Sequence, residues 1–307
     1  MSFKIGKLNI GIIGHGFIGQ EVVKELILSK NFNIKILDRN RNIYDNEVNW
    51  HQSDFRERKA ISAFIEDLDI LIHLASSTVP ASGNISGEID IKENISAMVQ
   101  ILDLTRKLNP KLYIIFASSA SVYGNQVNFP INELNTPRPK SFYGLQKLSI
   151  EHFLRIYYQK YKINYVSCRI SNPYGHGQKS NTLQGIISII KKSLEHENKI
   201  SIYGAKECSR DFIYINDLAK AIISLCFVRP INSEVNISTG IETNISDLIG
   251  KIEKITSRNI LATFEGLRET DIARSVLDNK LLKSLTKWEP KVNLDQGIEE
   301  FINKDLT

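Results

Sequence analysis

The chain has 307 residues, 42% of them hydrophobic and 24% charged, which is enough for one large α/β domain or for two lobes that share a core. No apolar run approaches the roughly 20 residues that span a bilayer, and the first residues do not resemble a signal peptide, so we expect a cytoplasmic protein with no membrane association. Three widely spaced cysteines and no histidines at metal-ligand spacing argue against a disulfide framework and against a metal site. The net charge of +5 is spread along the chain, so no nucleic-acid partner is expected.

Short runs rich in β-branched residues predict strands, and the amphipathic stretches between them predict helices. The predicted strands cover residues 8–13, 33–37, 48–51, 69–75, 111–118 and 164–170. Helical spacing occurs in two apolar sets, which are Ile18, Val22, Val23 and Leu26, and then Ile95, Met98, Val99, Leu102 and Leu108. This alternation predicts an α/β fold of the Rossmann type, a doubly wound parallel sheet with helices on both faces.

The pattern changes after about residue 172. Further elements are expected near residues 182–196 (helix), 200–203 (strand) and 211–215 (strand). We therefore expect a first domain over residues 1–172, to which the chain returns around residues 216–240, and a smaller C-terminal lobe mainly over residues 173–307. No repeat, low-complexity tract or charge block indicates a flexible linker between them.

A glycine-rich motif, GHGFIG, follows the first predicted strand directly and opens the first predicted helix. In such a GxGxxG loop Gly14 permits the tight turn, and Gly16 lets the backbone approach a pyrophosphate. Gly19 lets helix and strand pack closely, and the helix N-terminus faces the phosphates. About 20 residues further on, Asp38 ends the second strand, where a carboxylate accepts hydrogen bonds from the adenosine ribose. Loop, strand and acidic residue together predict a dinucleotide site.

The residues around Asp38 bear on which dinucleotide is bound. A carboxylate at this place repels a 2′-phosphate and so favours NAD over NADP. Arg39 and Arg41 argue the other way, since either could hold such a phosphate, although both also suit a solvated loop. We expect NAD as the cofactor.

A Tyr-x-x-x-Lys pair, Tyr143 and Lys147, begins a predicted helix after a proline-rich loop. Four residues make about one helical turn, so both side chains share a face, and the ammonium is expected to lower the phenol pKa so that Tyr143 serves as a general base. Tyr158 and Lys162 repeat the spacing, but they lie far along the same helix, where packing is the expected role. The preceding segment FASSASVYG ends the fifth strand, at the sheet edge where ligands bind, and this selects Tyr143.

Taken together, these motifs resemble the extended short-chain dehydrogenase/reductases, specifically the NAD-dependent epimerase/dehydratase family that includes UDP-glucose 4-epimerase. The resemblance covers nearly the whole chain. Beyond the glycine loop and the Tyr-Lys pair it includes SSASVYG (118–124), NPYG (172–175), RDFIYINDLA (210–219), and RETD followed by LDNKLLKSLTKWEP (268–290). An ordered set of this kind is far more specific than any single motif.

The resemblance implies roles for individual residues. Tyr143, Lys147 and Ser119 would be catalytic, with Ser119 bonded to the reacting sugar oxygen and Lys147 also holding the nicotinamide ribose. The implied NAD site comprises Gly14, Gly16, Phe17, Ile18, Gly19, Asp38, Arg39, Asp54, Phe55, Leu74, Ala75, Ser76, Asn94, Tyr143 and Lys147. The implied site for a nucleotide-diphosphate sugar comprises Thr78, Ser119, Tyr143, Asn172, Arg210 and Arg268.

Some of these residues also have simpler explanations. Asp54 could cap the helix that follows it, Asn94 could be a helix-surface residue, and Arg268 could be one of many solvated basic residues. Asp217, within RDFIYINDLA, is expected to cap a helix and to take no part in the chemistry.

The chain departs from the family pattern at three positions. Ile13 stands where the family usually has a further glycine, and Gln146 replaces the small residue that commonly precedes the catalytic lysine. Thr78 stands where some 4-epimerases carry a lysine. These departures leave the catalytic residues in place but weaken any exact assignment of the substrate.

Four functions are compatible with the resemblance. A 4-epimerase, which oxidises C4 transiently to a 4-keto intermediate, needs no acid or base beyond the Tyr, Lys and Ser set. A keto-sugar reductase often prefers NADPH, against which Asp38 weighs. A 4,6-dehydratase is disfavoured, because Ala120 and Ser121 stand where that branch has Asp-Glu. A non-catalytic dinucleotide sensor generally loses the tyrosine or the lysine, so we expect a 4-epimerase.

The resemblance also implies a homodimer and a place in bacterial surface-polysaccharide synthesis. The dimer interface would pack the helices around residues 94–108 and 143–160 against their copies. Apolar residues on the second helix suit such an interface, but they serve equally for packing on the sheet: Leu148, Phe153, Leu154 and Ile156.

Overall fold

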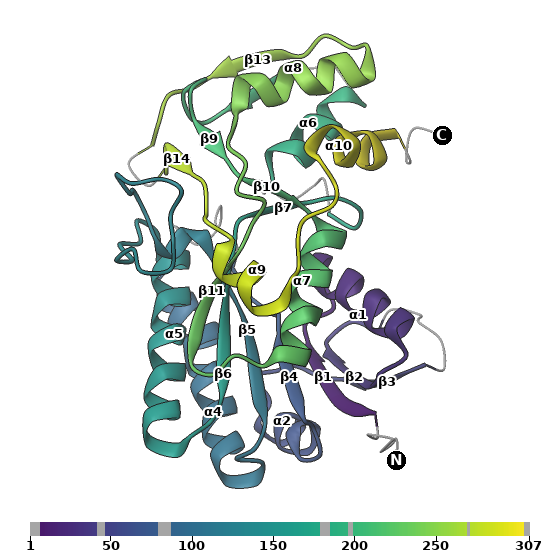
Figure 1. Ribbon diagram of the computed structural model, residues 1–307, viewed down its shortest axis with the longest axis vertical. Coiled ribbons are helices and arrows are strands. Elements are labelled where there is room, and N and C mark those ends of the chain that lie inside the picture. Colours follow the sequence, from purple (N-terminus) through teal and green to yellow (C-terminus); the bar gives the residue numbers. More distant parts are fainter. Residues whose placement is uncertain are drawn as a thin grey trace.

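The computed structural model describes residues 7–41, 47–78, 87–178, 185–195, 199–268 and 271–303 (Figure 1). Its larger part is a seven-stranded parallel sheet with helices on both faces. A smaller lobe, built from segments after residue 172, lies beyond the carboxyl ends of the strands. The predicted α/β class is confirmed.

All six predicted strand runs are strands of the large sheet, and a seventh strand comes from later in the chain. The strands are β1 (Leu8–Ile13), β2 (Phe32–Asp38), β3 (Val48–Gln52), β4 (Ile70–His73), β5 (Tyr113–Ser119), β6 (Tyr165–Ile170) and β11 (Ser233–Ile237). Their order is β11-β6-β5-β4-β1-β2-β3, with every neighbouring pair parallel. The direction of winding reverses between β1 and β4, which is where an open α/β sheet leaves a ligand crevice.

The helices cover the two faces of the sheet separately. One face carries α1 (Phe17–Ser29), α7 (Ile215–Val228) and α9 (Lys280–Thr286), and the other carries α2 (Arg58–Ile65), α4 (Ser96–Leu108) and α5 (Phe142–Tyr161). Because strand side chains alternate, Ile12 and Ile72 pack on the first face, whereas Ile13 and Leu71 pack on the second. Both faces are buried, so the central strands are apolar throughout.

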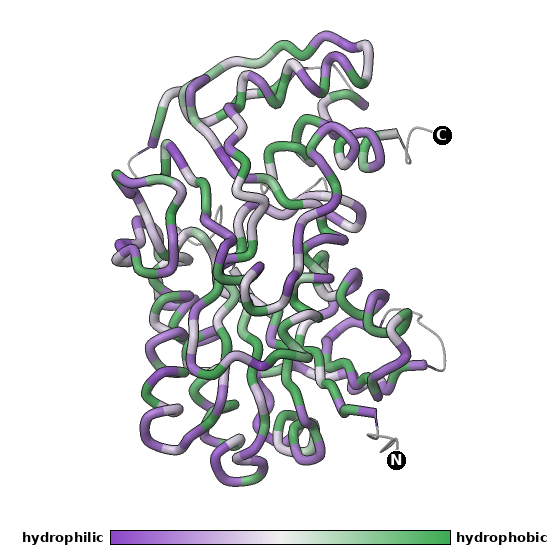
Figure 2. The backbone as a smooth tube through the Cα atoms, viewed as in Figure 1, coloured by the Kyte–Doolittle hydropathy of each residue, from purple (hydrophilic) through white to green (hydrophobic). Residues whose placement is uncertain are grey.

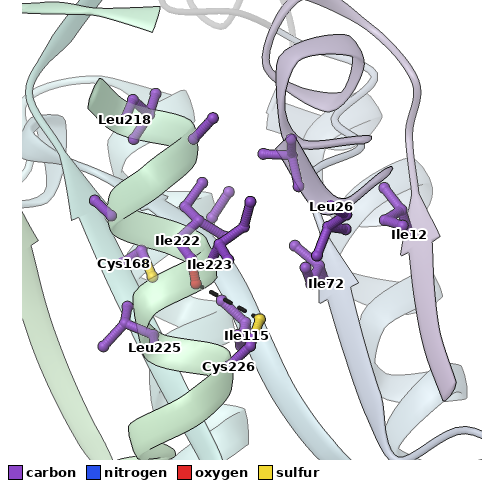
Figure 3. Packing of buried hydrophobic residues seen from close by; sticks show 14 of the residues in the cluster. Ile12, Leu26, Ile72, Ile115, Cys168, Leu218, Ile222, Ile223, Leu225 and Cys226 are labelled. Atoms are coloured by element: carbon purple, nitrogen blue, oxygen red, sulfur yellow. Dashed lines mark hydrogen bonds between the residues drawn. The ribbon is translucent and has the colours of Figure 1, made fainter. Parts of the chain in front are cut away.

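The packing on the first face joins segments that are distant in sequence. Figure 3 shows Ile222 of α7 packed among Ile115 and Cys168 of the sheet, with Leu26 of α1 beside Ile72. Full burial of one such side chain contributes about 1.5–3 kcal/mol, so the late segments α7 and β11 are integral to this core. α9, still later in sequence, also contributes Leu282 to this core.

The smaller lobe is assembled from short strands and three helices around its own core. Its elements are β7 (Asn172–Tyr174), α6 (Ile186–Leu194), β8 (Lys199–Ile202), β9 (Ser209–Arg210), β10 (Phe212–Tyr214), β12 (Thr243–Asn244), α8 (Ile245–Thr256), β13 (Leu261–Phe264), β14 (Arg274–Ser275) and α10 (Leu294–Asn303). The core gathers apolar side chains from α6, α8, α10 and the strands. Part of the helix predicted near residues 182–196 lies outside the described residues, and α6 is its described portion.

Asp211, between β9 and β10, ties the lobe to the segments beside it. Its carboxylate accepts hydrogen bonds from the backbone of Thr239 and Gly240 and, at 3.4 Å, from that of Leu277. Asp217 has a comparable role: it accepts from the backbone N–H groups of Lys291 and Val292, both at 2.8 Å. The prediction that Asp217 caps a helix is therefore wrong, because its carboxylate holds a distant loop instead.

The outer surfaces of the helices are polar, and the strands of the sheet are apolar (Figure 2). In the part of the chain that the structure describes, no helix has the length and apolar character needed to cross a membrane. Among the same residues, no cluster of three or more His, Cys, Asp or Glu side chains is arranged to hold a metal ion.

Candidate active site

One cavity of about 1150 Å³ extends from the carboxyl ends of β1, β2, β4 and β5 into the smaller lobe. The loop after β1, the start of α5 and the residues around β7, β8 and β9 all contribute to its wall. The cavity therefore lies at the reversal point of the sheet and joins the two parts of the molecule.

The glycine loop has the steric properties that a bound pyrophosphate requires. A Cβ on Gly14, which has φ of +97°, would lie 2.7 Å from the backbone N of Ala75, and a Cβ on Gly19 would lie 2.2 Å from the carbonyl O of Gly14. A Cβ on Gly16 would meet nothing within 4 Å, so this backbone faces the open cavity. Gly16 is also the N-cap of α1 and supplies no side-chain cap, which leaves the first N–H groups of the helix for a ligand.

Asp38 is held at the other edge of this end of the cavity. Its Oδ2 accepts the backbone N–H of His15 at 2.7 Å and its Oδ1 accepts that of Asn40 at 2.9 Å. The carboxylate is thereby oriented by two backbone donors while it lines the cavity. Arg39 lines the cavity beside it, and Arg41 is not among the lining residues. The N–H donors of the glycine loop and helix N-terminus, together with the acceptor carboxylate of Asp38, fit a dinucleotide.

Ser119, Tyr143 and Lys147 line the cavity together and contact one another. Ser119 is the last residue of β5, whereas Tyr143 and Lys147 lie one turn apart at the start of α5. Ser141 caps this helix by accepting the N–H of Gly144 at 3.1 Å. A Cβ on Gly144 would lie 2.6 Å from the carbonyl O of Ser121, so the glycine lets α5 start close to the turn after β5. This close approach brings the tyrosine to the serine.

Lys147 and Ser119 each form a hydrogen bond within the site. Lys147 Nζ donates to the carbonyl O of Ala117 at 2.8 Å and lies 5.6 Å from the centre of the Tyr143 ring. The Ser119 hydroxyl bonds the tyrosine and is itself 3.1 Å from Oγ of Ser121. By contrast, Tyr158 and Lys162 lie at the far end of α5, away from the residues that line the cavity.

Burial has the largest influence on the pKa values of Tyr143 and Lys147. It raises the pKa of Tyr143 to about 12, while the hydrogen bond with Ser119 opposes this shift. Burial also lowers the pKa of Lys147 to about 8, and the charges of Asp90 and Glu151 oppose that shift. The expected lowering of the tyrosine pKa by Lys147 is therefore not the net effect in the protein alone, because desolvation of the phenolate outweighs it.

Residues at the lobe end of the cavity include three of those implied for the substrate. Asn172 begins β7, and its side-chain amide donates to the carbonyl O of Asp211 at 3.1 Å. Arg210 lies on β9 and donates to the carbonyl oxygens of Ser209 and Ala273 at 2.8 and 3.2 Å. Both line the cavity, and backbone carbonyl groups fix the partly buried Arg210.

Arg268 is more exposed than Arg210. Its guanidinium lies 4.4 Å above the centre of the Tyr203 ring and pairs with Asp271 at 3.0 Å. All three residues line the cavity. Tyr203 and Asp271 were not predicted. Tyr203 directly follows strand β8, whose alternating pattern carries no chemical signature. For Asp271, the segment RETD that contains it was the one available signal.

Most of the predicted cofactor contacts line the cavity, whereas Asp54 and Asn94 are not brought to it. The lining residues are Gly14, Gly16, Phe17, Ile18, Gly19, Asp38, Arg39, Phe55, Leu74, Ala75 and Ser76, besides Tyr143 and Lys147. The Asp54 carboxylate is engaged by Arg56 at 2.6 Å. The Asn94 side chain is buried, accepts the N–H of Ser77 at 2.9 Å and lies near the hydroxyl of Thr78.

A parallel sheet with a glycine loop at its reversal point, joined to a Ser, Tyr and Lys set, defines a class of dinucleotide-dependent enzymes. The sequence profile of the NAD dependent epimerase/dehydratase family matches residues 10–237. The chain therefore belongs to this family, whose cofactor is NAD.

Known proteins similar to the chain are nucleotide-sugar enzymes. It is 31% identical to the putative UDP-glucose 4-epimerase of Methanocaldococcus jannaschii over 94% of this chain and 95% of the relative. It is 28% identical to a dTDP-4-dehydro-6-deoxyglucose reductase of Escherichia coli, over 94% of each. The structure of UDP-glucose 4-epimerase from Thermotoga maritima, determined with UDP-glucose, has a TM-score of 0.90 and 26% identity and covers 98% of this chain and 100% of that one.

Proposed function

We propose that this protein is an NAD-dependent nucleotide-sugar 4-epimerase. The observation that carries the proposal is the meeting of Ser119, Tyr143 and Lys147 in the wall of one cavity, which the glycine loop and the arginines of the lobe also line. This arrangement suits a sugar whose reacting carbon lies between a dinucleotide and a diphosphate anchor.

The chain's own residues would perform the proton transfers. Tyr143 takes the proton of the C4 hydroxyl and later returns it, while Ser119 donates a hydrogen bond to the same oxygen. The ammonium of Lys147 stabilises the tyrosinate and holds a ribose. When bound, NAD supplies the hydride acceptor and the positive charge of its nicotinamide ring, which opposes the upward shift in the pKa of Tyr143.

NAD would be held by backbone groups of the glycine loop, by Asp38 at the adenosine ribose and by Ala75 and its neighbours after β4. The nucleotide diphosphate would be held by Asn172, Arg210 and Arg268. Binding energy from the diphosphate, which is remote from C4, would retain the 4-keto intermediate while the sugar turns to present its other face.

A keto-sugar reductase is the second candidate, because one relative at 28% identity is named a dTDP-4-dehydro-6-deoxyglucose reductase. A reduced cofactor would then supply a hydride to the keto carbon, Tyr143 would donate its proton to the keto oxygen, and the oxidised NAD would leave after each turnover. A 4,6-dehydratase is disfavoured, since Ala120 and Ser121 bring no carboxylate to the site and Ser121 bonds Ser119.

The decisive test is proton NMR of the purified protein with UDP-glucose, UDP-galactose, UDP-N-acetylglucosamine and their dTDP counterparts, with no reduced cofactor added. Appearance of the C4 epimer supports the epimerase and names the substrate. Turnover of a 4-keto sugar only with added NADH or NADPH would instead support the reductase.

We include in this proposal a homodimer formed through α4 and α5, together with a cytoplasmic location and a role in polysaccharide synthesis. Several apolar side chains on these two helices are exposed, among them Leu108, Leu145, Ile156 and Tyr161. Of the residues expected at the interface, Leu154 instead packs in the core under the sheet. A purely monomeric species in light scattering at micromolar concentration would refute the dimer.

A further inference from the structure

A buried polar cluster around Asp90 adjoins Thr78, which lines the cavity. Asp90, the last residue of α3 (Gly87–Asp90), is 2% exposed and precedes the π-helical turn η1 (Ile91–Ile95). The Thr78 hydroxyl donates to Asp90 Oδ1, and the side-chain amide of Asn94 is 3.5 Å from the same oxygen. Asp90 Oδ2 is buried and has no hydrogen-bond partner among the residues that the structure describes. One carboxylate oxygen is thus fixed while the other remains uncommitted.

The same cluster reaches the catalytic helix. Oε1 of Gln146, the residue directly before Lys147, lies 3.0 Å from the Thr78 hydroxyl. Gln146 is almost completely buried. The large side chain at this position, which departs from the family pattern, therefore links α5 to the loop after β4 and to Asp90.

Asp90 and Lys147 are two buried side chains of opposite charge. Lys147 is 3% exposed, and within the described part of the chain neither it nor Asp90 forms an ion pair. Glu151, one turn beyond Lys147, is committed to Arg169 through bonds of 2.7 and 3.1 Å and to Ser118 at 2.6 Å. Because an uncompensated buried charge is costly, the ammonium needs another anion nearby.

The groups that face Lys147 from each neighbouring element show which of them could compensate the charge of its ammonium. The neutral carbonyl of Ala117 faces Lys147 from β5. Tyr143 and Glu151 face it from α5, where Glu151 is already paired with Arg169. From β4 comes His73, whose pKa burial lowers to about 3, so it is neutral at pH 7. The charge of Asp90 acts on both Tyr143 and Lys147 and raises the pKa of each.

Resting on the proposed function, we propose that Asp90 is a positioning residue of the active site, a buried counter-ion that keeps Lys147 protonated. Asp90 is itself held by Thr78 and Asn94, and Gln146 contacts the hydroxyl of Thr78. The counter-ion offsets the cost of burying the ammonium, so the lysine remains a cation at the pH of the reaction. Thr78 then serves the cofactor end of the site through Asp90 in addition to lining the cavity.

The test is Asp90→Asn, which keeps the shape of the side chain and removes its charge. Titration of the Lys147 ammonium is followed by NMR of protein labelled with ¹⁵N at lysine Nζ, without any sugar, so the result does not depend on the proposed reaction. We expect the Lys147 midpoint to fall by about one to two pH units. An unchanged midpoint in the folded variant overturns the proposal.

Glu88→Gln is the matched control, because it removes an exposed carboxylate from the same short helix, where Glu88 pairs with the exposed Lys92. This variant should leave the Lys147 midpoint unchanged, and an equal shift would overturn the assignment to Asp90. If Asp90→Asn does not fold, the ¹³Cγ shift of Asp90 in the natural protein decides. An ionised carboxyl at pH 7 supports the counter-ion, and a protonated one overturns it.

Turnover supplies a second readout once a substrate is known. Loss of the anion lowers the Lys147 pKa below its value of about 8, so the lysine deprotonates at a lower pH. The alkaline limb of kcat should therefore move to lower pH in Asp90→Asn, with a smaller change in KM. A profile that falls equally at every pH would indicate a merely structural role.

Discussion

The two ends of the cavity are built in different ways. The dinucleotide end is formed mainly by backbone, namely the turn at Gly14, the open face at Gly16 and the N-terminus of α1, with Asp38 held by two backbone donors. The lobe end is formed by long side chains on short strands and loops, chiefly Arg210 and Arg268. Backbone sites depend on the fold itself, whereas side-chain sites can be exchanged without disturbing it.

This difference accounts for the spread of functions among the relatives. A cofactor end fixed by glycine sterics tolerates little change, so NAD is common to the family. The lobe end can present other side chains to other sugars. If the proposed function holds, the particular sugar would depend on a few exchangeable residues of the lobe end.

The largest effect is expected where the two ends meet. Tyr143→Phe removes the phenol that transfers the proton while keeping the ring, and turnover should fall by about 10²–10⁴-fold. NAD binding, measured by fluorescence titration, should be retained, because the variant keeps the ring of Tyr143 and leaves the glycine loop and Asp38 unchanged. Unchanged turnover would disprove the proposed mechanism.

The sequence predicts the backbone-built end better than the side-chain-built end. The GHGFIG spacing and the apolar strand runs encode local geometry, so β1, α1 and the loop between them could be read directly. Tyr203 and Arg268, by contrast, meet only because β8 and β13 pair, and no local pattern encodes that contact. For the same reason the sequence misplaced Asp217, whose partners Lys291 and Val292 are distant in the chain.

Alanine substitutions at Gly19 and Gly16 distinguish a glycine needed for packing from a glycine needed for the approach of NAD. A methyl at Gly19 would collide with the carbonyl of Gly14, so Gly19→Ala should destabilise the fold by about 1–3 kcal/mol in denaturant unfolding. Gly16→Ala has room and should change stability by less than about 0.5 kcal/mol. Its NAD affinity should still fall about tenfold, or about 1.4 kcal/mol, because the methyl occupies the cavity side. Equal stability losses in both variants would contradict this distinction.

At the lobe end, Arg210→Ala should raise KM for the nucleotide sugar while leaving NAD affinity unchanged. Loss of a hydrogen bond from a charged group costs about 1.5–3 kcal/mol, which corresponds to roughly 10–100-fold in KM. Arg274→Ala is the matched control, since Arg274 lies on the adjacent strand and pairs with Glu242 outside the cavity. A matching rise in KM in the control would mean that the lobe as a whole had been disturbed.

The smallest effect is expected at Arg268, although it lines the same cavity. Its guanidinium is exposed and already pairs with Asp271, so binding a diphosphate exchanges one solvent-screened interaction for another. Such exposed pairs contribute about 0.2–1 kcal/mol, and Arg268→Ala should raise KM by less than about fivefold at physiological salt. Steady-state kinetics at low and high salt would check this, because screening should abolish the difference between variant and natural protein. An effect as large as that of Arg210→Ala would mean that Arg268 becomes buried against the substrate, and the lobe end would then close over its ligand.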